Sequence, residues 1–458
     1  MELTELKNKV ASREAHLAVI GLGYVGLPVA AMFAEVGFDV LGIEIKPERV
    51  QKIEQGVSPI EGEEPGMEEL LAKVINTGKL RASSNYSALS GCDIVLIDVE
   101  TPVDDHHIPR YEALTASLRA LAPLLKEGAL VIIESTIAPG TMQKVALPLL
   151  EAGSGRKVNQ GFYLGNCPER VMPGKLLSNL RTLSRVVGGS SPQVAEVMVS
   201  LYRCIVQADL DPVDWITAEL VKTVENAYRD VQIAFANEVA LICEALGGDV
   251  WKVRQLVNKS PYRQMHLPGA GVGGHCIPKD PWLLAYGVEG LEVPLRLIPA
   301  SRTVNDGMPL HVASLLEDAL TQAGGSLAGA RILVMGYAYL ENSDDTRNSP
   351  TRVLVEHLNL LGAEVVVHDP FVSEYQGDLL SAAQSCDAVV VMVAHAPYKE
   401  LDLPALQAVL RRPVLVDGRN LYDAGTLWTA GWVYRGIGKP AALSTQPGQV
   451  PFKNVFDD

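Results

Sequence analysis

The pattern Gly-Leu-Gly-Tyr-Val-Gly at 21–26 is the feature that most restricts the fold of this chain. It follows a short apolar run at 17–20 and precedes a segment with helical spacing at 27–36. A second apolar run lies at 38–43. Strand, tight turn, helix and strand in this order form the opening unit of a doubly wound parallel sheet. We therefore expect the chain to begin with a Rossmann-like α/β domain.

The three glycines have different tasks in such a loop. Gly21 permits the tight turn, Gly23 lets the backbone approach a pyrophosphate, and Gly26 allows the helix to pack closely on the strand. The N-terminus of the helix then faces the phosphates. The loop therefore predicts a dinucleotide site.

A carboxylate at the end of the second strand indicates which dinucleotide is bound. Glu44 occupies this place, where it would accept hydrogen bonds from a ribose diol and repel a 2′-phosphate. This favours NAD over NADP. Lys46 and Arg49 lie nearby in the sequence and keep NADP open as the second choice.

The C-terminal third repeats the first in a degraded form. The segment 331–336 resembles the opening strand and turn, and 363–369 resembles the second strand. The segment 385–397, SCDAVVVMVAHAP, resembles GCDIVLIDVETP at 91–102. The second copy lacks the three-glycine loop, so a nucleotide bound there need not be a dinucleotide.

A helical pattern runs from 214 to 246 without glycine or proline and ends at Gly247 and Gly248. At 1.5 Å per residue such a helix is ~50 Å long, enough to bridge two domains. Its apolar face suits either a dimer surface or a buried core helix.

The length of 458 residues indicates about three domains at roughly 150 residues each. We expect an α/β protein with two Rossmann-like doubly wound parallel-sheet domains joined by a helical middle. The expected boundaries are 1–212 for the dinucleotide-binding domain, 213–325 for the helical domain and 326–458 for the second nucleotide-binding domain.

The formal net charge of −15 argues against nucleic acid or an anionic membrane as the main partner. The 6 cysteines are scattered, with no CxxC pair and no zinc-ligand spacing, so no metal site is predicted. The first residues lack the apolar core of a secretory signal, and no run reaches the ~18 apolar residues needed to span a bilayer. We expect a reduced, cytoplasmic protein.

One cysteine stands on a glycine-rich turn. Cys276 follows the segment 268–274, which carries too little side-chain mass for a core strand and suggests backbone held near a ligand. A buried structural cysteine is the alternative. Oxidation of an alcohol to a carbonyl needs no nucleophile, whereas oxidation onward to an acid requires a group that adds to the aldehyde. A thiolate is such a group.

Two polar residues of the long helix, Lys222 and Asn226, are four apart and share one face. Turned toward the thiol loop, the ammonium would favour the thiolate and an alkoxide, and Asp280 would hold the ammonium or a water molecule. The alternative is an ordinary solvated helix face.

Two strand-end segments offer further polar groups. Glu169 lies between prolines at 168 and 173 and would orient a water that hydrolyses a thioester, unless it only forms a surface salt bridge in a turn. Thr136 follows a predicted strand, at the edge where open α/β sheets bind ligands.

Together these residues resemble the UDP-glucose/GDP-mannose dehydrogenase family over nearly the whole chain. The matching segments are 21–28, 134–136, 168–170, 222–229, 273–282, 344–350 and 417–420. Within the family, the sequences PERVMPG, ENAYRD and GGHCIPKDPW are most similar to the branch that oxidises UDP-N-acetylmannosamine.

The resemblance implies an NAD-dependent four-electron oxidation of the C6 hydroxyl of a UDP-N-acetylhexosamine, through a thiohemiacetal and a thioester on Cys276. UDP-N-acetylglucosamine and UDP-glucose are the alternative substrates. A simple two-electron dehydrogenase and a non-catalytic nucleotide-sugar sensor are alternative functions. It further implies a UDP-binding C-terminal domain and a homodimer or higher oligomer built on the long helix.

The resemblance also assigns roles to individual residues. Catalytic roles fall to Cys276, Lys222, Asp280, Glu169, Asn226 and Thr136. Cofactor contacts fall to Gly21, Gly23, Tyr24, Val25, Gly26, Glu44, Arg49, Thr101, Thr136 and Arg347. Substrate contacts fall to Glu169, Arg170, Val171, Lys222, Asn226, Arg229, His266, Gly269, Gly273, Tyr339 and Arg419.

Three places depart from the family pattern. Leu340 stands where the family has lysine, and Tyr262-Arg263 replaces a Pro-Arg order. Lys279 is typical of the UDP-glucose branch rather than the acetamido-sugar branch. The sugar is therefore less sharply predicted than the reaction.

Overall fold

The computed structural model describes residues 2–60, 62, 64–172 and 174–441. It divides into two compact units. The N-terminal unit contains the chain up to Glu225 together with Lys279–Val293, and the C-terminal unit contains Asn226–Pro278 together with the described chain from Pro294 onward. In this described part, no helix is both long enough and apolar enough to cross a membrane.

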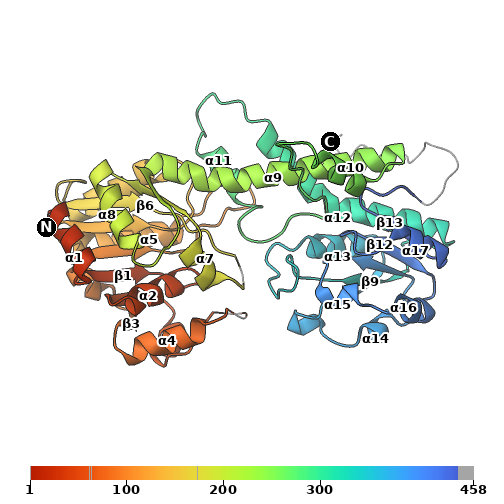
Figure 1. The fold of residues 1–458 in the computed structure, drawn as a ribbon, viewed down its shortest axis with the longest axis horizontal. Helices are drawn as coiled ribbons and strands as arrows, with labels where there is room; N and C mark the ends of the chain where they lie inside the picture. Colours follow the sequence, from red (N-terminus) through yellow and green to blue (C-terminus); the bar gives the residue numbers. More distant parts are fainter. Residues whose placement is uncertain (1, 61, 63, 173, 442–458) are drawn as a thin grey trace. The chain divides into compact units, whose positions relative to one another are not determined.

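The N-terminal unit is built on an eight-stranded sheet with the order β3-β2-β1-β4-β5-β6-β7-β8 (Figure 1). Its strands are β1 His16–Ile20, β2 Asp39–Ile43, β3 Leu80–Ser83, β4 Ile94–Ile97, β5 Ala129–Ile133, β6 Phe162–Asn166, β7 Arg185–Gly189 and β8 Leu210–Asp214. Alternate side chains of β1 enter two different hydrophobic clusters, Leu17 and Val19 on one face and Ala18 and Ile20 on the other. Both faces of the sheet are therefore buried, as a doubly wound fold requires.

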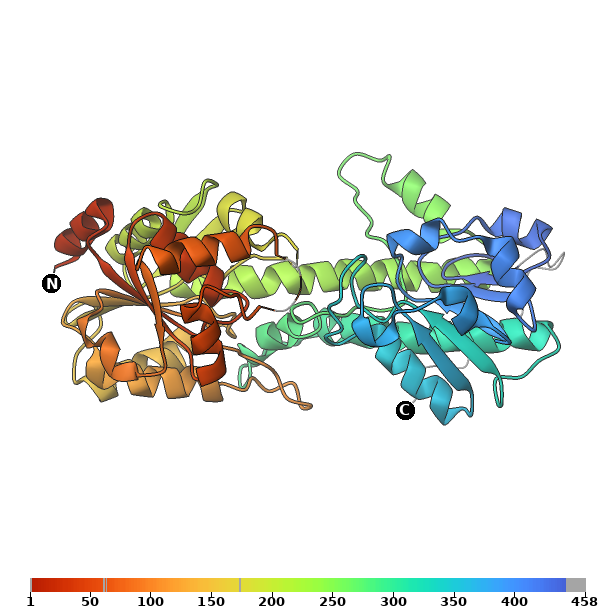
Figure 2. The ribbon, with the colours of Figure 1, turned by 90° about the horizontal axis from the view of Figure 1, so that it is seen from below.

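Helices cover these two faces, as the perpendicular view also shows (Figure 2). They are α1 Leu3–Ser12, α2 Gly26–Glu35, α3 Pro47–Glu54, α4 Met67–Asn76, α5 Glu112–Leu121, α6 Leu147–Ser154, α7 Leu176–Thr182, α8 Pro192–Tyr202 and α11 Asp280–Tyr286. Shorter turns of helix are η1 Tyr86–Gly91, η2 Ala122–Leu124 and η3 Met142–Ala146.

The C-terminal unit holds a five-stranded, all-parallel sheet with the order β10-β9-β11-β12-β13. Its strands are β9 Arg331–Met335, β10 Glu364–His368, β11 Ala388–Val391, β12 Val414–Asp417 and β13 Val433–Gly436. Its helices are α10 Val250–Val257, α12 Leu297–Gln322, α13 Pro350–Leu360, α14 Leu379–Ala383, α15 Ala396–Lys399, α16 Leu403–Val409 and α17 Ala424–Thr429, with the short η4 Ser373–Tyr375.

The predicted long helix is confirmed as α9, Trp215–Leu246, with 32 residues. The chain passes from the N-terminal unit to the C-terminal unit within it, after Glu225.

The prediction of two Rossmann-like sheets is confirmed, with one difference. β6 and β7 pair antiparallel, so the first sheet is not parallel throughout. The connection between them, 167–184, contains the short α7 Leu176–Thr182. The chain enters β7 from the end at which it left β6.

Candidate active site

The three glycines of the cofactor loop are required for different reasons. Gly21 has a φ of +92°, and a Cβ there would lie 2.4 Å from the carbonyl oxygen of Asp98. A Cβ on Gly26 would lie 2.0 Å from the carbonyl oxygen of Gly21. A Cβ on Gly23 would meet no described atom within 4 Å. Gly21 and Gly26 are thus fixed by the protein itself, while Gly23 faces the open space that a pyrophosphate needs.

The helix that follows this loop leaves its first N–H groups available. Val25 stands at the N-cap of α2, and no side chain caps this end among the described residues. Uncapped N–H groups at a helix N-terminus attract anions. The loop and the helix end therefore suit the phosphates of a dinucleotide.

The carboxylate predicted to bind the ribose is in place. Glu44 follows β2, is 8 % exposed, and accepts a hydrogen bond of 3.0 Å from the backbone N–H of Lys46. Arg49 lies 3.5 Å from Glu44 Oε2 and donates to the carbonyl oxygen of Leu22 at 2.9 Å. Because these contacts hold the guanidinium beside Glu44, Arg49 is not set out to receive a 2′-phosphate. The residues present fit NAD.

Behind the loop lies a buried acid that the sequence did not single out. Burial and the charge of Glu134 hold the pKa of Asp98 well above its usual range. Glu134 itself accepts hydrogen bonds from Arg185 at 3.1 Å and from the Tyr202 hydroxyl at 2.6 Å. Asp98 and Glu134 thus form a buried pair of acids beside the glycine loop, and burial disfavours the charged form of Asp98.

Lys222 is not on a solvated helix face. It is 7 % exposed, and its ammonium donates to the carbonyl oxygen of Glu169 at 2.7 Å and lies 3.9 Å from Glu169 Oε1. Glu169 Oε2 is buried and has no hydrogen-bond partner among the described residues. The structure thus brings two predicted catalytic groups together and leaves one carboxylate oxygen able to accept from a ligand or water. Asn226 lies one turn further along α9.

The residues after Glu169 are held firmly. Arg170 forms a bidentate pair with Glu225 and donates to the carbonyl oxygen and hydroxyl of Ser184 at 2.5 and 3.0 Å. Val171 packs against the hydrophobic core. Arg170 therefore fixes this loop, and its guanidinium is largely committed within the protein.

A second cluster joins α11 to the strand ends. Asp280 is fully buried at the start of α11, and the ammonium of Lys279 lies 3.2 Å from its Oδ1. The same ammonium donates to the carbonyl oxygen of Thr101 at 3.2 Å. The Thr101 hydroxyl in turn donates to the carbonyl oxygen of Thr136 at 2.6 Å. Asp280, Thr101 and Thr136 are thus brought together.

Glu219 is a further residue that the sequence reading missed. It is 1 % exposed, and its oxygens accept the backbone N–H groups of Gly140 and Met142, each at 2.8 Å. Burial raises its pKa to about 7, against the opposing effect of these N–H groups. It ties the loop that follows Thr136 to α9, one turn before Lys222. Its position three residues before Lys222, on the same face of one helix, could have indicated that it belongs to the site.

In the C-terminal unit, the glycines of the thiol loop pack against the protein itself. A Cβ on Gly273 would lie 2.6 Å from the Tyr339 Cβ, and one on Gly274 would lie 2.8 Å from the Tyr339 ring. A Cβ on Gly269 would lie 2.8 Å from Nη1 of Arg419. At these three positions a Cβ would meet side chains of the chain itself, so the glycines allow close packing; that the backbone of Gly269 and Gly273 also contacts the substrate stays a prediction.

The thiol lies among charged and aromatic groups. Cys276 is half-buried, is not in a disulfide, and is close enough to Tyr339 and Arg347 to affect their titration. Arg347 pairs with Asp345, with Nε to Oδ1 at 2.9 Å, and this pairing raises the pKa of the guanidinium. Burial raises the pKa of Tyr339 to about 12, so its phenol stays neutral. Cys276 therefore interacts electrostatically with the Arg347 guanidinium, which is itself paired with Asp345, and with the neutral Tyr339 phenol.

Two further predicted substrate residues, Arg419 and His266, form hydrogen bonds with nearby backbone. Arg419 donates through Nε to the carbonyl oxygen of Met392 at 2.6 Å, and burial lowers its pKa. The His266 ring accepts the N–H of Leu267 at 2.9 Å, and burial, with a smaller effect from Arg229, lowers the pKa of His266.

Three models of one family match this chain. The NAD binding, central and UDP binding domains of the UDP-glucose/GDP-mannose dehydrogenase family match residues 15–206, 216–307 and 333–424. UDP-N-acetyl-D-mannosamine dehydrogenase of Pyrococcus horikoshii is 39 % identical over 423 residues, which cover 92 % of this chain and 99 % of the relative. UDP-N-acetyl-D-glucosamine 6-dehydrogenase of Pseudomonas aeruginosa is 33 % identical and covers 90 % of this chain and 98 % of its own.

Solved structures agree with the sequence relatives. The UDP-D-ManNAc dehydrogenase of P. horikoshii superposes with a TM-score of 0.87 at 38 % identity, covering 93 % of this chain and 99 % of that one. The NDP-N-acetyl-D-galactosaminuronic acid dehydrogenase of Methanosarcina mazei gives 0.85 at 36 % identity, covering 96 % and 98 %. The chain therefore belongs to the UDP-glucose/GDP-mannose dehydrogenase family and is an NAD-dependent nucleotide-sugar dehydrogenase.

Proposed function

We propose that this enzyme oxidises the C6 hydroxyl of UDP-N-acetyl-D-mannosamine to the carboxylate, through a thioester on Cys276. The observation that carries the proposal is the half-buried Cys276, which is in no disulfide and interacts electrostatically with Arg347, in a chain that also holds a complete dinucleotide loop. A two-electron alcohol dehydrogenase has no use for such a thiol.

NAD, when bound, accepts the hydride that leaves C6 in each of two oxidations. Lys222 and Asp280 take up the hydroxyl proton of the substrate and stabilise the oxyanions of the reaction. The thiolate of Cys276 adds to the aldehyde carbon to form a thiohemiacetal, and loss of hydride converts this adduct to a thioester. Water then breaks the C–S bond, releasing the carboxylate and the thiolate.

The water needs an acceptor that orients it. Oε2 of Glu169 has no hydrogen-bond partner among the described residues, while the backbone of Glu169 is held by Lys222. We assign Glu169 to this water, with Thr136 and Asn226 as supporting polar groups. The hydrogen bond from Lys222 to the Glu169 backbone favours a fixed position of this carboxylate, which preorganises it for the water.

The sugar assignment rests on relatives and on the position of Lys279. UDP-N-acetyl-D-mannosamine is the substrate named for the P. horikoshii relative, whereas UDP-N-acetyl-D-glucosamine is that of the P. aeruginosa relative. The ammonium of Lys279 is committed to Thr101 and Asp280 inside the N-terminal unit. A lysine at this position therefore does not by itself favour UDP-glucose.

We also propose that the enzyme assembles through α9 as a homodimer or a higher oligomer. Large apolar side chains are exposed along this helix at Ile216, Leu220, Val224, Tyr228, Phe235, Ile242 and Leu246. Such a row covers more apolar surface than a monomer ordinarily leaves in water. We further propose domain boundaries at 212 and 325. A reducing compartment such as the cytoplasm completes the proposal, because none of the 6 cysteines is in a disulfide.

The first test counts the NADH formed per molecule of UDP-N-acetylmannosamine, UDP-N-acetylglucosamine, UDP-glucose and GDP-mannose. A ratio near two on UDP-N-acetylmannosamine supports the proposal, and a ratio near one contradicts the thioester. Turnover on another sugar alone moves the substrate assignment, and no turnover on any supports a sensor.

The second test replaces the nucleophile. Cys276→Ser should permit at most slow aldehyde formation or a trapped ester, detected as a mass increase of the protein. Cys204→Ser changes a partly exposed free thiol elsewhere and serves as the control. Full turnover in Cys276→Ser contradicts the role of the thiol.

A further inference from the structure

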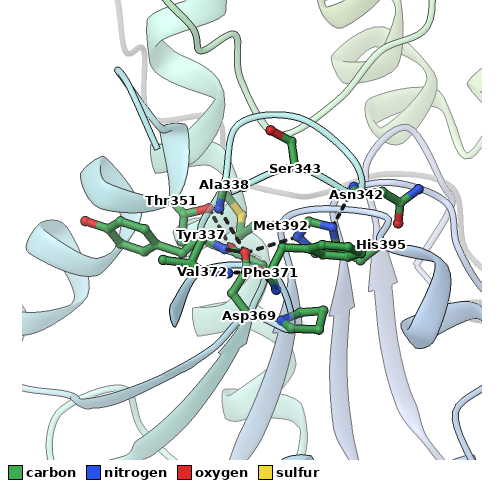
Figure 3. Close-up of polar contacts among 12 residues, drawn as sticks. Tyr337, Ala338, Asn342, Ser343, Thr351, Asp369, Phe371, Val372, Met392 and His395 are labelled. Atoms are coloured by element: carbon green, nitrogen blue, oxygen red, sulfur yellow. Dashed lines mark hydrogen bonds and ion pairs between the residues drawn. The ribbon is translucent and has the colours of Figure 1, made fainter. Parts of the chain in front are cut away.

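A buried acid of the C-terminal unit, Asp369, is surrounded by hydrogen-bond donors (Figure 3). Asp369 directly follows β10 and is fully buried. Its five donors are Tyr337 N at 2.6 Å and Ala338 N at 2.9 Å to Oδ2, Phe371 N at 2.8 Å and Val372 N at 3.2 Å to Oδ1, and His395 Nε2 at 3.0 Å to Oδ2.

The histidine of this pair has no nitrogen left for a substrate. His395 is fully buried, and its Nδ1 lies 2.9 Å from the backbone N–H of Asn342. A ring nitrogen that accepts from an N–H carries no proton, so Nε2 carries it and donates to Asp369. The imidazole is neutral with both nitrogens engaged. Although an Asp–His pair is typical of proton transfer in active sites, this one cannot abstract a proton from a ligand.

What the pair holds is the loop 337–348. Asp369 binds the first two N–H groups of this loop and His395 binds the N–H of Asn342 in its middle. The Asn342 side chain accepts the N–H of Ala396 at 2.8 Å, which ties the loop to α15 as well. Figure 3 shows Asn342 and Ser343 above the pair, on the loop that the pair supports.

The same loop carries the groups that touch the thiol segment. Tyr339 packs on Gly273 and Gly274, as described above. The N–H of Gly274 donates to the carbonyl oxygen of Arg347 at 2.9 Å, and the Asn348 side chain donates to the carbonyl oxygen of Gly274 at 3.0 Å. A shift of the loop must therefore shift the backbone two residues before Cys276.

We propose that Asp369 and His395 are positioning residues for the oxidation: they fix the loop 337–348 and thereby set the distance between the Arg347 guanidinium and the Cys276 thiol. The inference rests on the proposed function only in giving this thiol a reaction to perform. A guanidinium near a thiol favours the thiolate, which is the nucleophilic form. The pair thus acts on the reaction through the loop, without contact with the substrate.

The test measures the alkylation of Cys276 by iodoacetamide as a function of pH, read by mass spectrometry of the peptide that contains it. His395→Gln keeps a donor toward Asp369 but lacks the acceptor for Asn342 N–H. We expect the rate at neutral pH to fall about three- to tenfold and the pH midpoint of alkylation to rise. The kcat for UDP-sugar oxidation should fall with the alkylation rate, because less of the thiol is in its nucleophilic form.

A matched control separates positioning from simple loss of stability. His368 is a buried histidine in β10, and its ring nitrogens bind the Tyr398 hydroxyl at 3.0 Å and the carbonyl oxygen of Gly377 at 3.2 Å, outside the loop 337–348. His368→Gln should lower the melting temperature without moving the alkylation midpoint of Cys276. If both histidine variants move the midpoint alike, the effect is general loosening and the proposal is overturned.

A second variant keeps the proposal testable if His395→Gln does not fold. Asn348 has a φ of +48°, which glycine adopts freely, and Asn348→Gly removes only the hydrogen bond to Gly274. It should move the alkylation midpoint in the same direction. An unchanged midpoint in every folded variant, in an enzyme that still turns over UDP-sugars, overturns the inference alone. Absence of turnover in the wild-type protein would instead contradict the proposed function and leave the alkylation result to decide the positioning role.

Discussion

The two sheets open with the same turn. Gly21 follows β1 with a φ of +92°, and Gly336 follows β9 with a φ of +93°. Gly21 donates its N–H to the carbonyl oxygen of Ile43 at the end of β2, and Gly336 donates to that of His368 at the end of β10, both at 2.8 Å. One supersecondary unit therefore occurs in both halves of the chain.

The carboxylate that follows the second strand is used differently in the two sheets. Glu44 keeps 8 % of its surface exposed and, among the described residues, accepts a hydrogen bond from Lys46 N. Asp369 is fully buried and accepts four backbone N–H groups beside His395. The first sheet leaves its carboxylate able to bind a ligand, and the second uses it to hold its own loop.

The helices that follow show the same contrast. α2 begins at Gly26 with no side-chain cap, whereas the Ser349 hydroxyl caps α13 by accepting the N–H of Thr351 at 3.1 Å. The first helix can offer its N–H groups to a pyrophosphate, and the second satisfies one of them internally. A nucleotide in the C-terminal unit must therefore be recognised by other groups than a glycine loop.

The largest effect is expected at Gly26, where the backbone of the protein leaves no space for a side chain. Gly26→Ala places a Cβ 2.0 Å from a backbone oxygen and should cost at least ~3 kcal/mol in the free energy of unfolding by urea. Gly23→Ala meets nothing within 4 Å and should leave that free energy within about 1 kcal/mol of wild type. It should nevertheless weaken NADH binding, followed by fluorescence, about 100-fold or ~2.7 kcal/mol. Equal unfolding of the two variants, or unchanged NADH binding by Gly23→Ala, would contradict this division of tasks.

Asp369→Asn should have the next largest effect. An amide cannot accept at its nitrogen, so buried N–H groups lose their acceptor at a cost of about 3 kcal/mol. Burial opposes ionisation of Asp369, but the hydrogen bonds from His395 and the backbone outweigh it and hold its pKa well below the usual range. The stability contributed by ionised Asp369 is thus present above about pH 4 and lost as pH falls further.

Urea unfolding at pH 7 and at pH 3 checks the expectation for Asp369. The difference between wild type and Asp369→Asn should shrink in acid. Asp378→Asn, which changes an exposed helix cap in the same unit, should cost about 1 kcal/mol or less. A difference for Asp369→Asn that grows in acid would show that the sign of the pKa shift is wrong.

The contrast also shows what the sequence could reveal. Apolar runs at 17–20 and 331–336 are alike, so both sheets and the long helix were predictable from periodicity. The role of Asp369 was not predictable, because the sequence around an acid at the end of a strand is the same whether the acid binds a ribose or accepts hydrogen bonds from five donors of the protein. The neighbour of Gly273 was not predictable for a related reason: a missing side chain indicates close packing without saying whether the neighbour is a ligand or, as here, Tyr339. Local sequence carries no information on which distant group fills a space.

Glu44→Gln should alter coenzyme choice without altering the fold. Removing the charge removes the repulsion of a 2′-phosphate, so the ratio of kcat/KM for NADP to that for NAD should rise about tenfold, or ~1.4 kcal/mol. The urea midpoint should stay close to wild type, in contrast with Asp369→Asn. Glu48→Gln, in the exposed first turn of α3, is the control and should leave the ratio unchanged. An equal change in both variants would assign the effect to the general negative charge of this edge.

The smallest effect is expected at Ser349, the side-chain cap of α13 that has no counterpart at the start of α2. Ser349→Ala removes the acceptor for Thr351 N–H and should cost about 1 kcal/mol of stability. Ser191→Ala, which removes the corresponding cap of α8, should cost a similar amount, because both helices lose one hydrogen bond at an N-terminus. Neither variant should change the KM for NAD. If Ser349→Ala instead weakened UDP binding measured by calorimetry while Ser191→Ala did not, the start of α13 would be a ligand site like that of α2, and the contrast between the two sheets would be smaller than the hydrogen bonds indicate.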